Sequence, residues 1–104
     1  MAIIASMVGI DLTTISRFEK PTSALIRRIL HPQEIADYQQ SPAKSLFLAQ
    51  RWAIKEALYK ADNQYYHFNR VKIARVGRVF KVPGFVVSTS REGDQCVAIV
   101  IKEF

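Results

Sequence analysis

Three side chains on two segments have the types and spacing needed for metal-assisted chemistry on phosphate groups. Asp11 follows the apolar run 1–10, and Glu56 and Lys60 are four residues apart in a segment without Gly or Pro. On a helix, that spacing puts both side chains on one face, with Cβ atoms about 5–6 Å apart. Two carboxylates together with water and phosphate oxygens suit Mg²⁺, and a lysine can hold a phosphate as a point charge.

A purely structural interpretation of the same residues is also open. Glu56 and Lys60 can form a surface ion pair that stabilises the helix by about 0.3 kcal/mol. Periodicity alone does not bring Asp11 to either of them. The chemical interpretation therefore depends on how the strand and the helix pack.

Two elements must position these side chains. The run 1–10 is rich in Ile, Val and Met and predicts a buried strand, which places Asp11 at or just past its end. Residues 44–61 predict the longest helix of the chain. A stripe of small residues lets that helix approach a sheet closely, and the stripe consists of Ala49, Ala53, Ala57 and Ala61.

The remaining segments predict an α+β fold with an antiparallel sheet. Thr13 and Thr14 are candidate caps of a short helix through Ile15 and Phe18 that Pro21 stops, and Thr22 or Ser23 opens a second helix. Pro32 is suited to the first position of a third helix that runs to about residue 39. From Asn69 the pattern changes to short strands, at 71–76, 79–82, 85–87 and 97–101, separated by turns rich in Gly and Pro.

Composition limits the chain to one folded domain, residues 1–104. It has 104 residues, of which 49% are hydrophobic, and this argues against disorder. A single cysteine, Cys96, excludes an internal disulfide framework and a multi-cysteine zinc site, and we expect it to be a small core residue. The apolar run 1–10 is shorter than the roughly 20 residues of a membrane span. We therefore expect a soluble cytoplasmic protein.

The charge balance favours an acidic partner. There are 15 Lys and Arg residues against 9 Asp and Glu, for a formal charge of +6. Between residues 63 and 91 the chain has six bases and no acid: Arg70, Lys72, Arg75, Arg78, Lys81 and Arg91. These bases can be an ordinary solvated surface. With the nearby aromatic residues 65–68, they also suit a non-enzymatic module that binds RNA or another polyanion.

A series of short motifs runs in order through residues 7–61 and again, more weakly, near residue 88. They are Val8-Gly9-Ile10-Asp11, Arg17-Phe18, Arg28-Ile29-Leu30 with Glu34, Arg51-Trp52-Ala53-Ile54-Lys55-Glu56-Ala57, Lys60-Ala61 and Val87-Ser88-Thr89-Ser90. This series resembles the holo-acyl-carrier-protein synthases, the small bacterial members of the 4′-phosphopantetheinyl transferase superfamily. The G-x-D and K-E-A-x-x-K-A elements at this spacing are a fairly specific combination.

The resemblance implies a reaction and its residues. The chain would transfer the 4′-phosphopantetheine group of coenzyme A to a serine of apo-acyl carrier protein, releasing 3′,5′-ADP and giving holo-acyl carrier protein for fatty acid synthesis. Asp11 and Glu56 would bind Mg²⁺, Glu56 would help to take the serine proton, and Lys60 would hold the pyrophosphate. Further candidate ligands of the coenzyme A phosphates are Arg51, Lys55 and Arg91.

The resemblance also implies partners. Family members are typically homotrimers with coenzyme A at the subunit interfaces, and this interpretation includes neither nucleic acid nor a membrane. Acyl carrier proteins are acidic, so an electrostatic docking surface is expected. Its candidate residues are Arg17, Lys20, Arg27 and Arg28.

The chain departs from the family pattern in three places. The segment between the predicted long helix and Ser88 is shorter than in typical members, which suggests a trimmed hairpin. Residues 62–65 lack the usual glycine, and Arg91 stands where the family has a histidine, so that position cannot titrate near neutral pH. An inactive relative that serves as a scaffold is therefore a further alternative.

Overall fold

The computed structural model describes residues 7–103. The part of the predicted N-terminal strand that falls on residues 1–6 lies outside this range. The described residues form the following elements in chain order: β1 (Val8–Thr14), η1 (Ile15–Phe18), α1 (Ser23–Ile29), α2 (Pro32–Gln40), α3 (Lys44–Ala61), η2 (Phe68–Arg70), β2 (Ala74–Val76), β3 (Val79–Lys81), β4 (Phe85–Glu92) and β5 (Gln95–Lys102).

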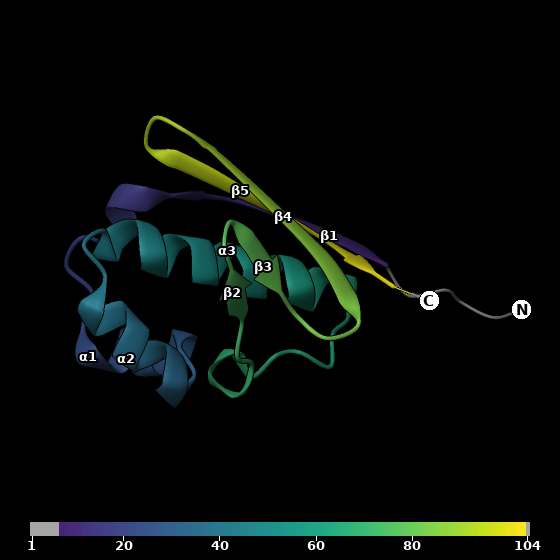
Figure 1. Ribbon diagram of the computed structural model, residues 1–104, viewed down its shortest axis with the longest axis horizontal. Coiled ribbons are helices and arrows are strands. Elements are labelled where there is room, and N and C mark those ends of the chain that lie inside the picture. Colours follow the sequence, from purple (N-terminus) through teal and green to yellow (C-terminus); the bar gives the residue numbers. More distant parts are fainter. Residues whose placement is uncertain (1–6, 104) are drawn as a thin grey trace, which may run out of the picture.

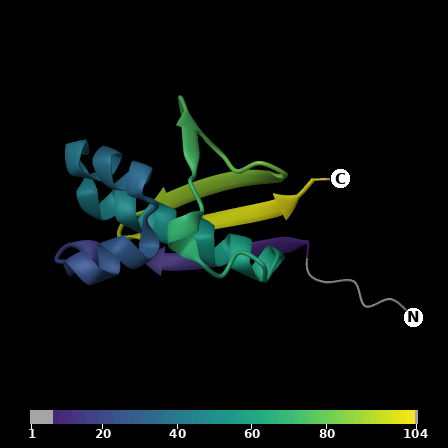
Figure 2. The same cartoon turned by 90° about the horizontal axis from the view of Figure 1, so that it is seen from below.

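The elements are arranged in layers around the long helix. Strands β1, β5 and β4 form an antiparallel sheet in that order, and β2 and β3 form a separate two-stranded hairpin. Helix α3 runs along one face of the three-stranded sheet, and α1 and α2 lie on the side of α3 away from the sheet (Figures 1 and 2). The predicted α+β class with an antiparallel sheet and a long central helix is confirmed.

The position predicted for Asp11 at the end of a strand is wrong. β1 continues to Thr14, which pairs with Gln95, so Asp11 is the fourth of its seven residues. Because side chains alternate between the faces of a strand, Gly9, Asp11 and Thr13 share the face toward α3. Asp11 is therefore covered by the helix.

A close contact between β1 and α3 depends on residues without bulky side chains. The predicted stripe of four alanines is buried on α3. At Gly9, an added Cβ would lie 1.7 Å from the carbonyl oxygen of Ala57. Only glycine leaves room for this approach, and the approach brings the C-terminal half of α3 down onto the middle of β1.

The helix starts follow the predicted caps with one exception. The Thr22 hydroxyl accepts a hydrogen bond from Leu25 N at 3.1 Å, and Pro32 is the first residue of α2. The predicted capping by Thr13 and Thr14 is wrong, because Thr14 makes no side-chain cap and Thr13 Oγ1 instead accepts a bond from Arg17. Both threonines belong to β1, whose pairing with β5 outcompetes a local cap.

Candidate functional site

Asp11, Glu56 and Lys60 come together where the middle of β1 crosses the C-terminal half of α3. Lys60 Nζ lies 3.3 Å from Asp11 Oδ1 and donates a hydrogen bond of 2.9 Å to the carbonyl oxygen of Ile10. Glu56 lies one helical turn before Lys60 on α3. It is close enough to Asp11 that the negative charge of Asp11 raises its pKa. The structure thus makes the contact that periodicity could not establish.

The two carboxylates share an unfavourable electrostatic environment. Burial is the main reason that the pKa of Asp11 lies above its usual value, and the hydrogen bond and charge of Lys60 only partly oppose it. Burial also raises the pKa of Glu56, and the charge of Asp11 raises it further. The ionised carboxylates are therefore incompletely compensated for their loss of water, and a bound cation would offset part of that cost.

Arg17 belongs to this site as well as to the surface. Its Nη1 donates to Thr13 Oγ1 at 3.2 Å, and its guanidinium carbon lies 5.6 Å from the centre of the Trp52 ring. Its positive charge opposes the raised pKa of both Asp11 and Glu56. Sequence reasoning assigned Arg17 to docking alone, since its distance from the carboxylates depends on how η1 packs on α3.

The residues present fit a hard divalent cation. Asp11 Oδ2 is buried and has no hydrogen-bond partner, so one carboxylate oxygen is left for a ligand. Within residues 7–103 no group of three His, Cys, Asp or Glu side chains gathers at metal-binding distance. Two carboxylates supply only part of an octahedral shell, which suits Mg²⁺ because it usually keeps several waters and binds substrate phosphates.

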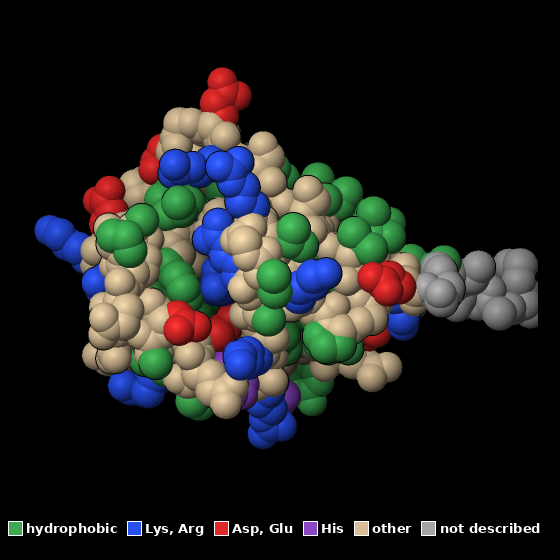
Figure 3. All heavy atoms as spheres, in the orientation of Figure 1, with side chains coloured by type: hydrophobic (Ala, Val, Ile, Leu, Met, Phe, Trp, Pro, Cys, Tyr) green, Lys and Arg blue, Asp and Glu red, His purple; other side chains and the backbone are tan. Residues whose placement is uncertain are grey.

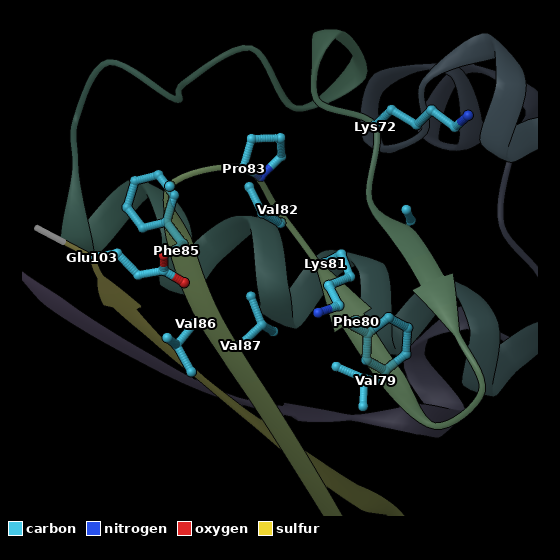
Figure 4. A pocket seen from close by; sticks show the side chains of 12 residues that line it. Lys72, Val79, Phe80, Lys81, Val82, Pro83, Phe85, Val86, Val87 and Glu103 are labelled. Atoms are coloured by element: carbon cyan, nitrogen blue, oxygen red, sulfur yellow. The ribbon is translucent and has the colours of Figure 1, made fainter.

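A pocket opens beside Glu56. It has a volume of about 440 Å³ and lies between the end of α1 and the segment that contains η2, with Trp52 and Glu56 of α3 at its base. Arg28, one of the predicted docking residues, also lines it. A larger groove of about 750 Å³ lies between β3 and β4 (Figure 4). That groove includes none of Asp11, Glu56 and Lys60, so the smaller pocket is the one related to the candidate chemistry.

Comparison with known proteins identifies the family. A model of the 4′-phosphopantetheinyl transferase superfamily matches residues 7–98. A holo-[acyl-carrier-protein] synthase of Mycoplasmopsis pulmonis is 45% identical over 96 residues, which are 92% of this chain and 89% of that protein. The chain belongs to the 4′-phosphopantetheinyl transferase superfamily. It is therefore an enzyme of the transferase class.

Solved structures of holo-[acyl-carrier-protein] synthases show the same fold as this transferase. The crystal structure from Neisseria meningitidis has a TM-score of 0.81 at 24% identity and covers 97% of this chain and 100% of that one. The structure from Bacillus anthracis, in complex with CoA (3′,5′-ADP), has a TM-score of 0.74 at 24% identity. The match covers 91% of this chain and 93% of that one. In the described part of this transferase, no helix is long and apolar enough to cross a membrane.

The transferase exposes its predicted docking bases near the candidate site. Arg17, Lys20, Arg27 and Arg28 are all exposed, on η1, just after it, and in the last turn of α1. The second group of bases, residues 70–81, lies on η2, the segment that follows it and the β2–β3 hairpin, where Figure 3 shows Lys and Arg side chains gathered. The two basic groups adjoin where Arg27 of α1 and Arg70 of η2 line one pocket.

Two predicted phosphate ligands lie in the interior of the transferase. Lys55 is fully buried, and its ammonium donates to Glu34 and to the carbonyl oxygens of Ile29 and Phe68. Arg51 is 4% exposed, with its Nε 3.4 Å from Glu34 Oε2. All three ammonium protons of Lys55 are used by protein oxygens. The structure therefore does not bring Lys55 or Arg51 to Lys60.

Two of the departures from the family pattern occupy defined positions. Arg91 is exposed on β4 in the register row Thr13–Cys96–Arg91, with β5 between it and β1. Residues 62–65 form a turn that the carboxylate of Asp62 organises, since Asp62 Oδ1 accepts a bond from Gln64 N at 3.0 Å. Asp62 Oδ2 lies 3.3 Å from Lys102 Nζ. The side chain of Asp62 thus shapes the turn that lacks a glycine.

Proposed function

We propose that this transferase moves the 4′-phosphopantetheine group of coenzyme A to a serine of an apo-acyl carrier protein in a magnesium-dependent reaction. In the transfer, a bond forms between the serine Oγ and phosphorus while the bond from phosphorus to the leaving 3′,5′-ADP breaks. The juxtaposition of Asp11, Glu56 and Lys60 is the observation that carries this proposal. The names of the relatives and the coenzyme A complex of the Bacillus anthracis structure support it.

Asp11 and Glu56 would hold the magnesium ion, which would neutralise charge on the phosphate oxygens when bound. Glu56 is the candidate proton acceptor for the serine hydroxyl, directly or through a water. In the metal-free protein, burial and the charge of Asp11 raise the pKa of this carboxyl. Lys60, whose side chain is half exposed, would hold the pyrophosphate and offset the charge on the leaving group.

The carrier protein would dock on the exposed bases of η1 and α1. Arg28 lines the pocket that contains Glu56, so a carrier bound to Arg28 would present its serine beside that carboxylate. Opposite charges on the two proteins would steer the encounter and set the orientation. The product, a holo-acyl carrier protein, would serve fatty acid synthesis in the cytoplasm.

A homotrimer is part of the proposal because the sheet has an uncovered apolar face. Val8, Ile10 and Leu12 alternate with the residues that face α3, and they are 51–62% exposed. The register places Ile101, Ile99 and Val97 of β5 beside them. An apolar face of this kind on a small protein marks an interaction surface, and the resemblance to trimeric enzymes supports other copies of this chain as its occupants.

The released nucleotide tests the proposed reaction. The protein is incubated with coenzyme A, Mg²⁺ and an apo-acyl carrier protein, and 3′,5′-ADP is measured by chromatography. We expect nucleotide release in proportion to the carrier added. A carrier whose acceptor serine is replaced by alanine is the control, and equal release with it would show hydrolysis of coenzyme A instead of transfer.

A further inference from the structure

A fully buried lysine lies directly behind the candidate catalytic carboxylate. Lys55 precedes Glu56 on α3, and its ammonium has three acceptors for its three protons. These are Glu34 Oε1, the carbonyl oxygen of Ile29 at 2.7 Å and that of Phe68 at 3.0 Å. The proposed reaction assigns this lysine no role.

The acceptors of Lys55 belong to the two walls of the pocket beside Glu56. Ile29 ends α1 and forms one wall with Leu25 and Arg28, whereas Phe68 begins η2 and belongs to the other. The ammonium therefore joins the two walls. A second connection is made by Asn69, whose Nδ2 donates to the carbonyl oxygen of Arg27 at 3.2 Å.

The partner of Lys55 is itself anchored on both sides. Glu34 Oε1 also accepts from the backbone N–H of His31 at 2.9 Å, and Glu34 Oε2 accepts from that of Ile73 at 3.3 Å. Glu34 thus holds the start of α2 and the chain before β2. The ammonium of Lys55 is therefore bonded to a carboxylate that two backbone N–H groups hold in place.

Stability alone is a poor explanation for this arrangement. Removing an ammonium from water costs several kcal/mol, and buried ion pairs are often replaceable by apolar residues without loss of stability. Burial accordingly lowers the pKa of Lys55 despite the charge of Glu34. Because Lys55 joins two walls of one pocket, its hydrogen bonds also have a geometric consequence.

We propose that Lys55 is a positioning residue of the transfer reaction. By joining α1 to η2, it keeps the pocket at the width at which the serine-bearing segment of the carrier protein reaches the Glu56 carboxylate. The hydrogen bond from Asn69 to the carbonyl oxygen of Arg27 supports the same distance between α1 and η2. This inference rests on the proposed function, because it assigns the pocket to the carrier protein.

The test compares Lys55→Met with Lys44→Met, an exposed lysine at the start of the same helix. Lys55→Met keeps the volume of the side chain and leaves Glu34 near Arg51. The melting temperature, the Kd for coenzyme A with Mg²⁺, and the kcat and KM for the carrier protein are measured where each variant is folded. We expect kcat to fall at least tenfold for Lys55→Met, with the Kd for coenzyme A within twofold, because small misplacements at a reacting centre are costly.

A purely structural role for Lys55 predicts a lower melting temperature with kcat within twofold of the unmodified protein, and that result would overturn the inference. If Lys55→Met does not fold, the exposed Asn69 decides the question. Asn69→Ala should lower kcat severalfold, and an unchanged kcat would equally reject the inference. If the unmodified protein transfers nothing, the proposed function has failed and the inference falls with it.

Discussion

Glu56 owes its chemical character to three neighbours. Burial against α3 and β1 disfavours its charged form, Asp11 adds repulsion, and Lys60 and Arg17 offset part of both effects. Because its pKa is raised in the folded protein, its ionisation lowers stability as the pH rises through that pKa. At neutral pH without metal, the ionised form of Glu56 therefore costs stability, and a bound divalent cation would reduce that cost.

We expect Glu56→Gln to abolish transfer and yet leave a stable protein. Loss of the carboxylate should lower the transfer rate at least about a hundredfold, as expected for removal of a general base. The neutral side chain should also raise the metal-free melting temperature at pH 7, because that cost disappears. The stabilisation that Mg²⁺ gives the unmodified protein in calorimetry should be absent from the variant.

The matched control is Glu19→Gln, an exposed glutamate at the end of η1. It should leave both the transfer rate and the effect of Mg²⁺ on the melting temperature unchanged. Undiminished transfer by a folded Glu56→Gln variant would remove Glu56 from the mechanism.

At the residue scale, the sequence predicted the three residues of the candidate site but not the charged residues of the interior. Residue types and spacing selected Asp11, Glu56 and Lys60, and the structure brings these three together. Lys55 shares the helix with them, and helical spacing alone did not show that α1, α2 and η2 cover its face. Charged residues usually lie at the surface, so the sequence could not reveal that Glu34 holds Lys55 inside.

At the element scale, the site depends on how closely α3 approaches β1. Small residues on both partners permit the approach, and the tightest point is Gly9 against the Ala57 carbonyl. The alanine stripe was visible in the sequence and predicted this packing. The length of β1 was not visible in the sequence, because the polar residues Asp11, Thr13 and Thr14 break the apolar run while the backbone pairing with β5 continues.

Gly9→Ala should therefore damage both the fold and the site. The added methyl group meets backbone atoms that have no free space, so we expect a loss of at least about 2 kcal/mol in the free energy of unfolding. Urea denaturation followed by circular dichroism measures this loss. Ser88→Ala, an exposed change on β4, should alter the free energy of unfolding by less than about 0.5 kcal/mol. A fully stable Gly9→Ala protein would show that α3 and β1 are not in this contact.

At the scale of the whole molecule, the exposed bases extend from η1 and α1 past η2 to the β2–β3 hairpin. Arg28→Glu should raise the KM for the carrier protein at least tenfold and leave the KM for coenzyme A within twofold, since Arg28 lies beside the pocket of Glu56. Arg78→Glu, on the exposed tip of the β2–β3 hairpin, is the matched control and should change neither KM. Equal increases in both KM values for Arg28→Glu would argue against the docking surface.

The outer face of the sheet makes a prediction about assembly. Ile10→Glu places a charge in the middle of the apolar face, so light scattering should show monomers of about 11.9 kDa for the variant and the proposed trimers for the unmodified protein. Val76→Glu, a similarly exposed change on the β2–β3 hairpin, should leave the trimer intact. A monomeric unmodified protein would contradict the proposed assembly.

The carrier protein itself provides the most direct test of the proposed reaction. Its intact mass is measured after incubation with this protein, coenzyme A and Mg²⁺, and again with EDTA in excess of the metal. The account predicts that each carrier gains one phosphopantetheine group and that EDTA prevents the gain. An unchanged carrier mass, under conditions where a known holo-[acyl-carrier-protein] synthase modifies the same carrier, would contradict the assignment of Asp11, Glu56 and Lys60 to this chemistry.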